Sequence, residues 1–207
     1  MTFRTAAIGF ATLAAIGSAA FAAMGVAHAA TPRMIPDHDA MGVYQIAQPG
    51  HPTQTWRVRY SAANQMLRAV SLSGQATGIA VLLDLAAGSA NVVVPQMHAV
   101  VAVPGLSGLI HKVLDRNDSH FTRLGQATIA GHQCTRYLVL KRRGDGSACI
   151  TPGGVVLAAT GKDDRGSLTV TALQMVDAPQ PPDDFAVPSG YSSVSLPPQM
   201  LAQLLGG

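Results

Sequence analysis

The sequence predicts a mainly β fold, a curved antiparallel sheet that forms a half-open barrel with one or two short helices packed in or over its mouth. Short apolar segments follow one another with Gly, Ser and Asn between them, which is typical of an antiparallel meander. Residues 92–94 and 100–101 are apolar at consecutive positions, so both faces of these segments need cover. A strongly curved sheet or partial barrel supplies that cover, whereas a flat sheet with water on both sides does not.

The clearest strand pattern lies at residues 55–61, where Trp56, Val58 and Tyr60 alternate with polar residues and so share one face. Other segments have the length and the flanking turn residues of short strands. In chain order, the expected strands are residues 41–47, 55–61, 66–70, 79–84, 91–94, 97–103, 126–130, 135–141, 148–151, 155–160 and 167–176.

An amphipathic helix is predicted over residues 106–115, where apolar residues recur at helical spacing. They are Leu106, Leu109, Ile110, Val113 and Leu114. This apolar stripe fits a lid over a cavity or a plain core helix, and both interpretations stay open. A short C-terminal helix or tail is expected over residues 197–207, because Pro lies near its start and Gly at its end.

The first 29 residues have the pattern of a secretory signal peptide. Arg4 precedes a long uncharged apolar run, and Ala27 and Ala29 form an A-x-A cleavage site. We expect cleavage after Ala29, a loose N-terminal arm over residues 30–40 and a single β domain over residues 41–196. These features predict a periplasmic protein with no integral membrane segment after cleavage.

The charge pattern limits the classes of partner and chemistry. The formal net charge is only +3, and the basic residues do not gather as a nucleic-acid-binding face requires, so we expect no nucleic-acid partner. The chain contains no Glu, which excludes the zinc motif H-E-x-x-H. No cofactor and no metal site is predicted.

Cys134 and Cys149 are the two cysteines, and a pair in an exported chain favours a disulfide. One geometry opposes it: if residues 144–146 form the tip of a simple hairpin, Cys149 lies opposite Lys141 and far from Cys134. Two free buried thiols are the alternative. We predict the bridge.

Several short motifs, in their order along the chain, resemble the periplasmic lipoprotein-carrier superfamily (Lol-type carriers) and the exported domains of unknown function related to it. The most recognisable is the ending at residues 185–191, which reads F-x-x-P-x-G followed by an aromatic or aliphatic residue, and the others are residues 59–61 with 66–68, residues 129–134 and residues 149–157. The resemblance implies a half-open barrel whose apolar interior, lidded by helices, holds acyl chains or an apolar partner segment.

No arrangement of residues indicates a reaction. The hydrolase motif G-x-S-x-G is absent, and residues 37–39 (Asp-His-Asp) are interpreted as a solvated segment rather than a metal site. His132 near Cys134 is interpreted as a structural residue, because no third group that would orient such a pair can be named. We therefore predict no catalytic residue and no enzymatic activity.

The predicted function is that of a periplasmic binding module that holds an acyl chain, lipid or lipidated partner on the concave face of the sheet. The candidate apolar lining combines one strand with the lid helix. These residues are Trp56, Val58 and Tyr60 on the strand, and Leu109, Ile110 and Val113 on the helix. The alternative is an envelope protein-interaction or assembly factor that takes a peptide or strand from its partner.

Overall fold

The structure, a computed structural model, describes residues 31–103, 119–141, 144–163, 166–197 and 200. The predicted signal peptide and the predicted helix at residues 106–115 lie outside these residues. So does the predicted C-terminal helix or tail at residues 197–207, apart from residues 197 and 200. In the described part of the chain, no helix is long and apolar enough to cross a membrane.

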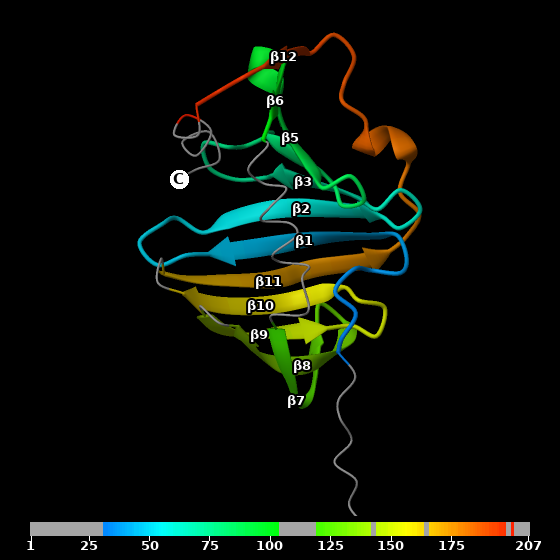
Figure 1. Cartoon of the computed structure of the whole chain (residues 1–207), viewed down its shortest axis with the longest axis vertical. Coiled ribbons are helices and arrows are strands. Elements are labelled where there is room, and N and C mark those ends of the chain that lie inside the picture. Colours follow the sequence, from blue (N-terminus) through cyan, green and yellow to red (C-terminus); the bar gives the residue numbers. More distant parts are fainter. Residues whose placement is uncertain (1–30, 104–118, 142–143, 164–165, 198–199, 201–207) are drawn as a thin grey trace, which may run out of the picture.

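The described residues form one twelve-stranded sheet and two short 3-10 helices, so the mainly β prediction is confirmed. Figure 1 shows the strands stacked in the order β12-β6-β5-β4-β3-β2-β1-β11-β10-β9-β8-β7. The strands are β1 (Ala40–Ala47), β2 (Gln54–Ser61), β3 (Met66–Ser71), β4 (Ala80–Asp84), β5 (Ser89–Val94), β6 (Ala99–Ala102), β7 (Ser119–Ile129), β8 (His132–Lys141), β9 (Gly144–Ile150), β10 (Val156–Asp163), β11 (Gly166–Asp177) and β12 (Ser192–Val194), and the 3-10 helices are η1 (Pro95–Met97) and η2 (Pro182–Phe185).

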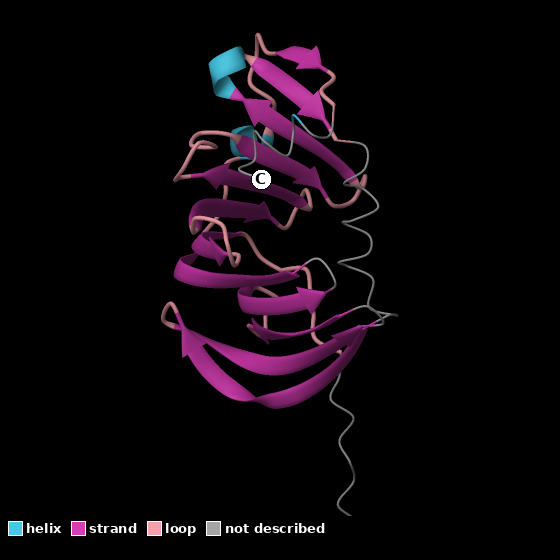
Figure 2. Cartoon of the chain, turned by 90° about the vertical axis from the view of Figure 1, so that its left-hand side faces the viewer, coloured by secondary structure: helices cyan, strands magenta, loops and turns pink. Residues whose placement is uncertain are grey.

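The sheet is open, which corrects the prediction of a half-open barrel. Its two edge strands, β12 and β7, lie at opposite ends of the strand order, and the sheet is neither closed nor strongly curled. The strands at its lower end are bowed (Figure 2). Neighbouring strands are antiparallel, with the exception of β12, which pairs in parallel with β6. The two apolar faces must therefore be covered by loops and side chains and not by barrel closure.

The upper half of the sheet buries both faces of β5 and β6, as the consecutive apolar residues predicted. Val92 lies opposite Val101, and their cluster includes Ala76 from the loop before β4. On the other face Val93 lies opposite Val100, and Tyr191 packs against their cluster.

Two of the motifs that carry the family resemblance, in three segments of the chain, meet in space at η2. The guanidinium of Arg59 on β2 donates to the Asp184 carboxylate at 2.6 Å, and that of Arg68 on β3 donates to the Asp184 backbone carbonyl at 2.7 Å. These bonds hold η2 against the sheet, where Phe185 is buried. The segments at residues 59–61, 66–68 and 185–190 therefore describe one packing unit.

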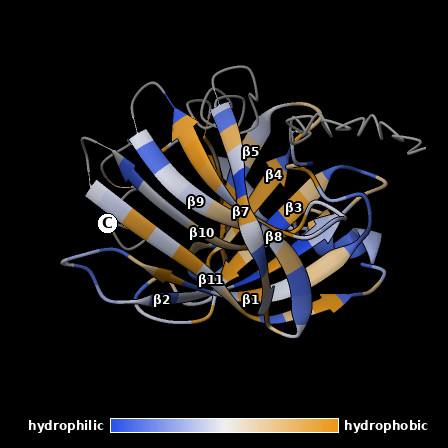
Figure 3. Ribbon diagram, turned by 90° about the horizontal axis from the view of Figure 1, so that it is seen from below, coloured by the Kyte–Doolittle hydropathy of each residue, from blue (hydrophilic) through white to orange (hydrophobic). Residues whose placement is uncertain are grey.

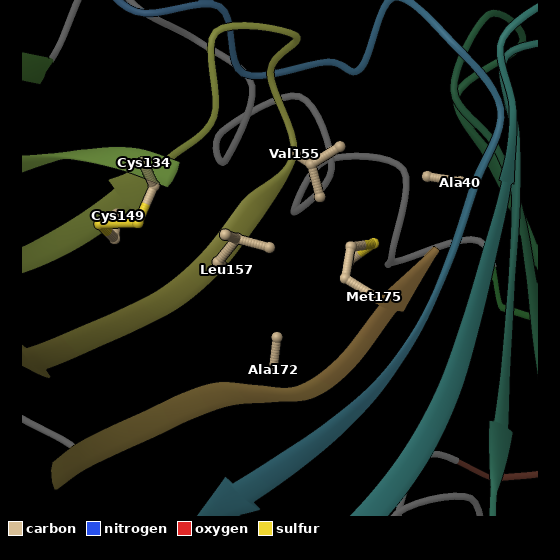
Figure 4. Packing of buried hydrophobic residues seen from close by; sticks show 7 residues of the cluster. All are labelled: Ala40, Cys134, Cys149, Val155, Leu157, Ala172 and Met175. Carbon is tan, nitrogen blue, oxygen red and sulfur yellow. A yellow bond between two sulfur atoms is a disulfide. The ribbon is translucent and has the colours of Figure 1, made fainter. Parts of the chain in front are cut away.

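The lower core is built around the disulfide between Cys134 and Cys149, which confirms the predicted bridge. Their Cα atoms are 5.3 Å apart, within the range that a disulfide spans. Leu157 is fully buried in the same cluster of residues (Figure 4). The complete buried set is Ala40, Cys134, Cys149, Val155, Leu157, Ala172 and Met175.

Candidate functional site

A cavity of about 660 Å³ lies against strands β7 to β11, in the lower half of the sheet. One row of directly opposed residues crosses all five strands and lines it. From β11 to β7 this row is Leu168, Gly161, Gly146, Val139 and Phe121. Because directly opposed residues of an antiparallel sheet point to the same face, the row places apolar side chains at each end and no side chain in the middle.

The small residues on β9 and β10 make room for this cavity. Gly161 faces open space: a Cβ atom placed on it has no other heavy atom within 4 Å. The next row of the same face adds Ala159 and Ala148 beside the larger Val170. At the β7 end, the ring of Phe121 packs edge-on against Tyr137, with 6.1 Å between ring centroids. The result is a mainly apolar hollow with an aromatic wall. Figure 3 shows that hydrophobic and hydrophilic residues alternate along the strands.

Charged residues line one end of the cavity, where β8 and β10 end and β9 and β11 begin. Lys141 lies opposite Ser119 and Gly144, which carry no charge. Lys162 lies opposite Asp145, and all three charged residues line the cavity. Nearby, the hydroxyl groups of Ser147 and Thr160 are hydrogen-bonded to each other at 2.9 Å.

The predicted strand residues lie on the same face of the sheet as the cavity but two strands beyond it. Trp56 on β2 lies opposite Tyr44, which in turn lies opposite Ala172, two residues from the cavity-lining Val170. The exposed fraction of the side chain is small for Trp56 (8%) and Tyr60 (4%), and Val58 is half-buried. None of the three lines this cavity.

Tyr44 separates these residues from the cavity. Its hydroxyl donates to the backbone carbonyl of Val156 on β10 at 3.1 Å, and burial raises the pKa of this hydroxyl. The remaining candidates, Leu109, Ile110 and Val113, lie outside the described residues, so their part in an apolar lining stays a prediction.

The sequence interpretation missed the residues that line the cavity. Phe121 precedes the segment predicted as a strand at residues 126–130, whereas β7 begins at Ser119. Gly146 and Gly161 read as turn residues in the sequence, although both lie within strands. The sequence did contain one signal for the cavity, a glycine in each of two successive segments. Glycine within a strand weakens packing and marks a close approach of the backbone or an open space.

A second, smaller cavity of about 180 Å³ lies beside a cluster of histidine and aspartate side chains that joins the N-terminal arm to the sheet. In this His–Asp cluster the His38 ring lies between two carboxylates: Nδ1 is 2.7 Å from Asp37 and Nε2 is 3.1 Å from Asp177. His132 places Nδ1 3.8 Å from the other Asp177 oxygen and Nε2 3.1 Å from the backbone carbonyl of Met175.

The arm predicted to be loose is therefore fastened to the body of the protein. The backbone N–H of Asp37 donates to the carbonyl of Gly153 at 2.9 Å, and the side chain of Asp37 forms an ion pair with Arg33. The same arm brings Met34 to the large cavity, which it helps to line. Among the described residues, no group of three or more His, Cys or Asp side chains is arranged to hold a metal ion.

The His–Asp cluster predicts a specific pH dependence. Hydrogen bonding to Asp37, with a further contribution from Asp177, raises the pKa of His38 above its ordinary value of 6.5. The part of its contribution to stability that depends on its charge is therefore complete below pH 6.5 and is lost as pH rises through the raised value. We expect His38→Ala to lower the free energy of unfolding more in mildly acidic solution than at alkaline pH, by a difference of less than about 1 kcal/mol, since the neutral ring can still donate one hydrogen bond.

Urea denaturation of both proteins across this pH range measures the difference. The exposed His51 offers a control, since His51→Ala removes an imidazole that takes no part in the His–Asp cluster. The hydrogen bond from His38 lowers the pKa of Asp37 below 3.8. The contribution of the pair to stability is lost again at more acidic pH, once this carboxylate is protonated. A His38 contribution that grows with rising pH would contradict the assignment.

No family model matches the sequence, and no curated protein matches it. Solved structures do match. An uncharacterized conserved protein from Thermus thermophilus has a TM-score of 0.57 at 9% identity, over 77% of this chain and 91% of that chain. MucB has a TM-score of 0.53 at 12% identity over 75% of this chain. In the MucA/MucB complex of Pseudomonas aeruginosa, the matched chain has a TM-score of 0.51 at 14% identity over 72% of this chain.

These matches show a shared fold. The chain spans 59% and 55% of the length of the two MucB-containing matches. A LolA superfamily protein from Nitrosomonas europaea also matches, with a TM-score of 0.41 at 12% identity over 74% of this chain and 92% of that chain. A LolA superfamily protein is therefore among the solved structures to which this chain is similar, and the likeness is one of fold.

Proposed function

We propose that this protein is an exported binding module that holds an apolar chain, the acyl chain of a lipid or of a lipidated partner, in the cavity over β7 to β11. The observation that carries the proposal is the 660 Å³ hollow, whose glycine floor lies between apolar walls. Ligand cavities are commonly about 300–1,000 Å³ and mainly apolar. Each methylene group transferred from water into such a site contributes about 0.8 kcal/mol.

The location that we propose is the periplasm. Residues 1–29 have the pattern of a cleaved signal peptide, and the disulfide between Cys134 and Cys149 requires an oxidising compartment to persist. In this proposal the ligand binds to the bowed lower end of an open sheet and not inside a half-barrel.

The proposal is one of binding and not of catalysis. The sulfur of Cys134 is bonded to Cys149, so it is not available as a thiolate to pair with His132. Both ring nitrogens of His132 lie against protein oxygens, at Asp177 and at Met175. These contacts favour a structural role for this histidine.

A variant that fills the cavity tests the proposal. Gly161→Leu should place its side chain in the hollow, since a Cβ atom there meets no other heavy atom within 4 Å. Titration of delipidated protein with the fluorescent fatty acid cis-parinaric acid should give saturable binding, and Gly161→Leu should weaken it at least tenfold, about 1.4 kcal/mol or more.

Thr128→Leu is the matched control, because Thr128 is exposed on β7, lies opposite Gln133 and does not line the cavity. It introduces the same leucine side chain away from the cavity and should leave binding unchanged. Absence of saturable binding by the wild type, or equal binding by Gly161→Leu and the wild type, would refute the proposal.

A second candidate function is the binding of a partner protein, which the likeness to MucB favours, since MucB forms a complex with MucA. In that case the same face would take an extended segment of the partner. Mass spectrometry of the native protein distinguishes the two: a bound lipid supports the first function, and a stoichiometric protein without lipid supports the second.

A further inference from the structure

We propose that the cavity over β7 to β11 selects a single-chain amphiphile with a negatively charged head group, which pairs with Lys141. This inference rests on the proposed function and adds the chemical class of the ligand. Its basis is the distribution of charge in the lining: the apolar row runs across the strands, and charged groups gather at one end.

The position of Lys141 follows from the register of β8. It comes two residues after Val139 on the same strand, so it lies on the cavity face, one row beyond the apolar row. Its directly opposed residues, Ser119 and Gly144, carry no charge. Its four-carbon stem can continue the apolar wall while its ammonium group meets the head of a bound chain.

Lys162 also borders the cavity, but it follows Gly161 directly on β10, so its side chain points to the opposite face of the sheet from that of Lys141. Its opposed residue, Asp145, is the one acidic side chain among the described lining residues, and the charges of this pair offset each other. Among the described lining residues, Lys141 is therefore the charged residue with no opposite charge in its row. A charged head group is therefore favoured when it is negative, and a neutral head gains no such attraction.

The volume of the cavity suits one acyl chain and not several. At about 660 Å³ it lies in the middle of the usual range for a small ligand. The selective ligand is thus an elongated apolar chain with a carboxylate or another anionic head, seated with its head at the Lys141 end.

The test compares cis-parinaric acid with the alcohol reduced from it, two fluorescent probes with the same apolar chain. Titrations run above neutral pH in low salt keep the acid ionised and Lys141 unscreened. The wild type should bind the acid about tenfold more tightly than the alcohol. Lys141→Met should reduce that preference to about twofold or less, because it removes the charge that attracts the acid.

Arg57→Met is the matched control, because Arg57 is an exposed cation on β2 that does not line the cavity, and it should keep the tenfold preference. Equal binding of acid and alcohol by the wild type would overturn the head-group inference and leave the proposed function standing. A preference that survives Lys141→Met would also overturn it. Failure of both probes to bind the wild type would overturn the proposed function itself.

Discussion

Replacing both Cys134 and Cys149 by alanine is expected to lower the free energy of unfolding by about 3 kcal/mol. The bridge closes a loop over a sequence separation of 15 and so restricts the unfolded chain. Both sulfurs are also buried against Leu157, which means that the substitution removes packed atoms from the lower core. Urea denaturation, followed by circular dichroism, measures the loss as a lower midpoint.

Reduction provides the control for this measurement. A reductant should lower the stability of the wild type towards that of the double-alanine variant and should leave the variant itself unchanged. If the variant is as stable as the oxidised wild type, the bridge contributes nothing to folding, and the role assigned to it is wrong.

The same pair of cysteines shows what the sequence could and could not predict. Chemistry and cellular compartment were sufficient to favour the bridge, but the expected hairpin register opposed it. The structure resolves the conflict, since β8 ends at Lys141 directly opposite Gly144, where β9 begins. This register puts Cys149 opposite Arg136, two residues from Cys134 on β8. A shift of a few residues in the connection between β8 and β9 therefore decides whether the two cysteines can form a disulfide.

Strand positions were predictable because period and turn residues are local properties. β2 and β3 begin and end within one residue of expectation, and the apolar run at residues 92–94 is covered on both faces. The closure of a sheet depends on interactions between distant strands, which no local pattern records. The edge strand β12, three residues long and parallel to β6, carries no periodic signal at all.

The cavity was not predictable for a related reason. Its row from Leu168 to Phe121 exists only once the five strands take their register, and its centre consists of glycines that contribute no apolar signal. The alternating pattern at residues 55–61 instead favoured Trp56 and Tyr60, which the structure places in the buried part of the same face. Hydrophobic patterning identifies surfaces that must be covered, and it does not show where a space is left.

The two floor glycines lie directly opposite each other, and identical substitutions at them should have opposite effects. Gly146→Ala is expected to lower the free energy of unfolding by about 3 kcal/mol, the upper end of the usual range for overpacking. A Cβ atom on Gly146 would overlap the backbone oxygen of Thr160, so β9 and β10 would have to move apart. Gly161→Ala should instead stabilise the protein by about 0.5–1 kcal/mol, since alanine loses less conformational freedom than glycine on entering a strand.

Urea denaturation of the two variants beside the wild type measures this difference, and cis-parinaric acid titration reports on the cavity. Gly146→Ala should impair binding even where it is folded, because separation of β9 from β10 distorts the floor between Val139 and Leu168. Gly161→Ala adds one methyl group to open space and should change binding by less than about threefold. Equal destabilisation by both substitutions would show that the close approach at Gly146 is not what reserves this position for glycine.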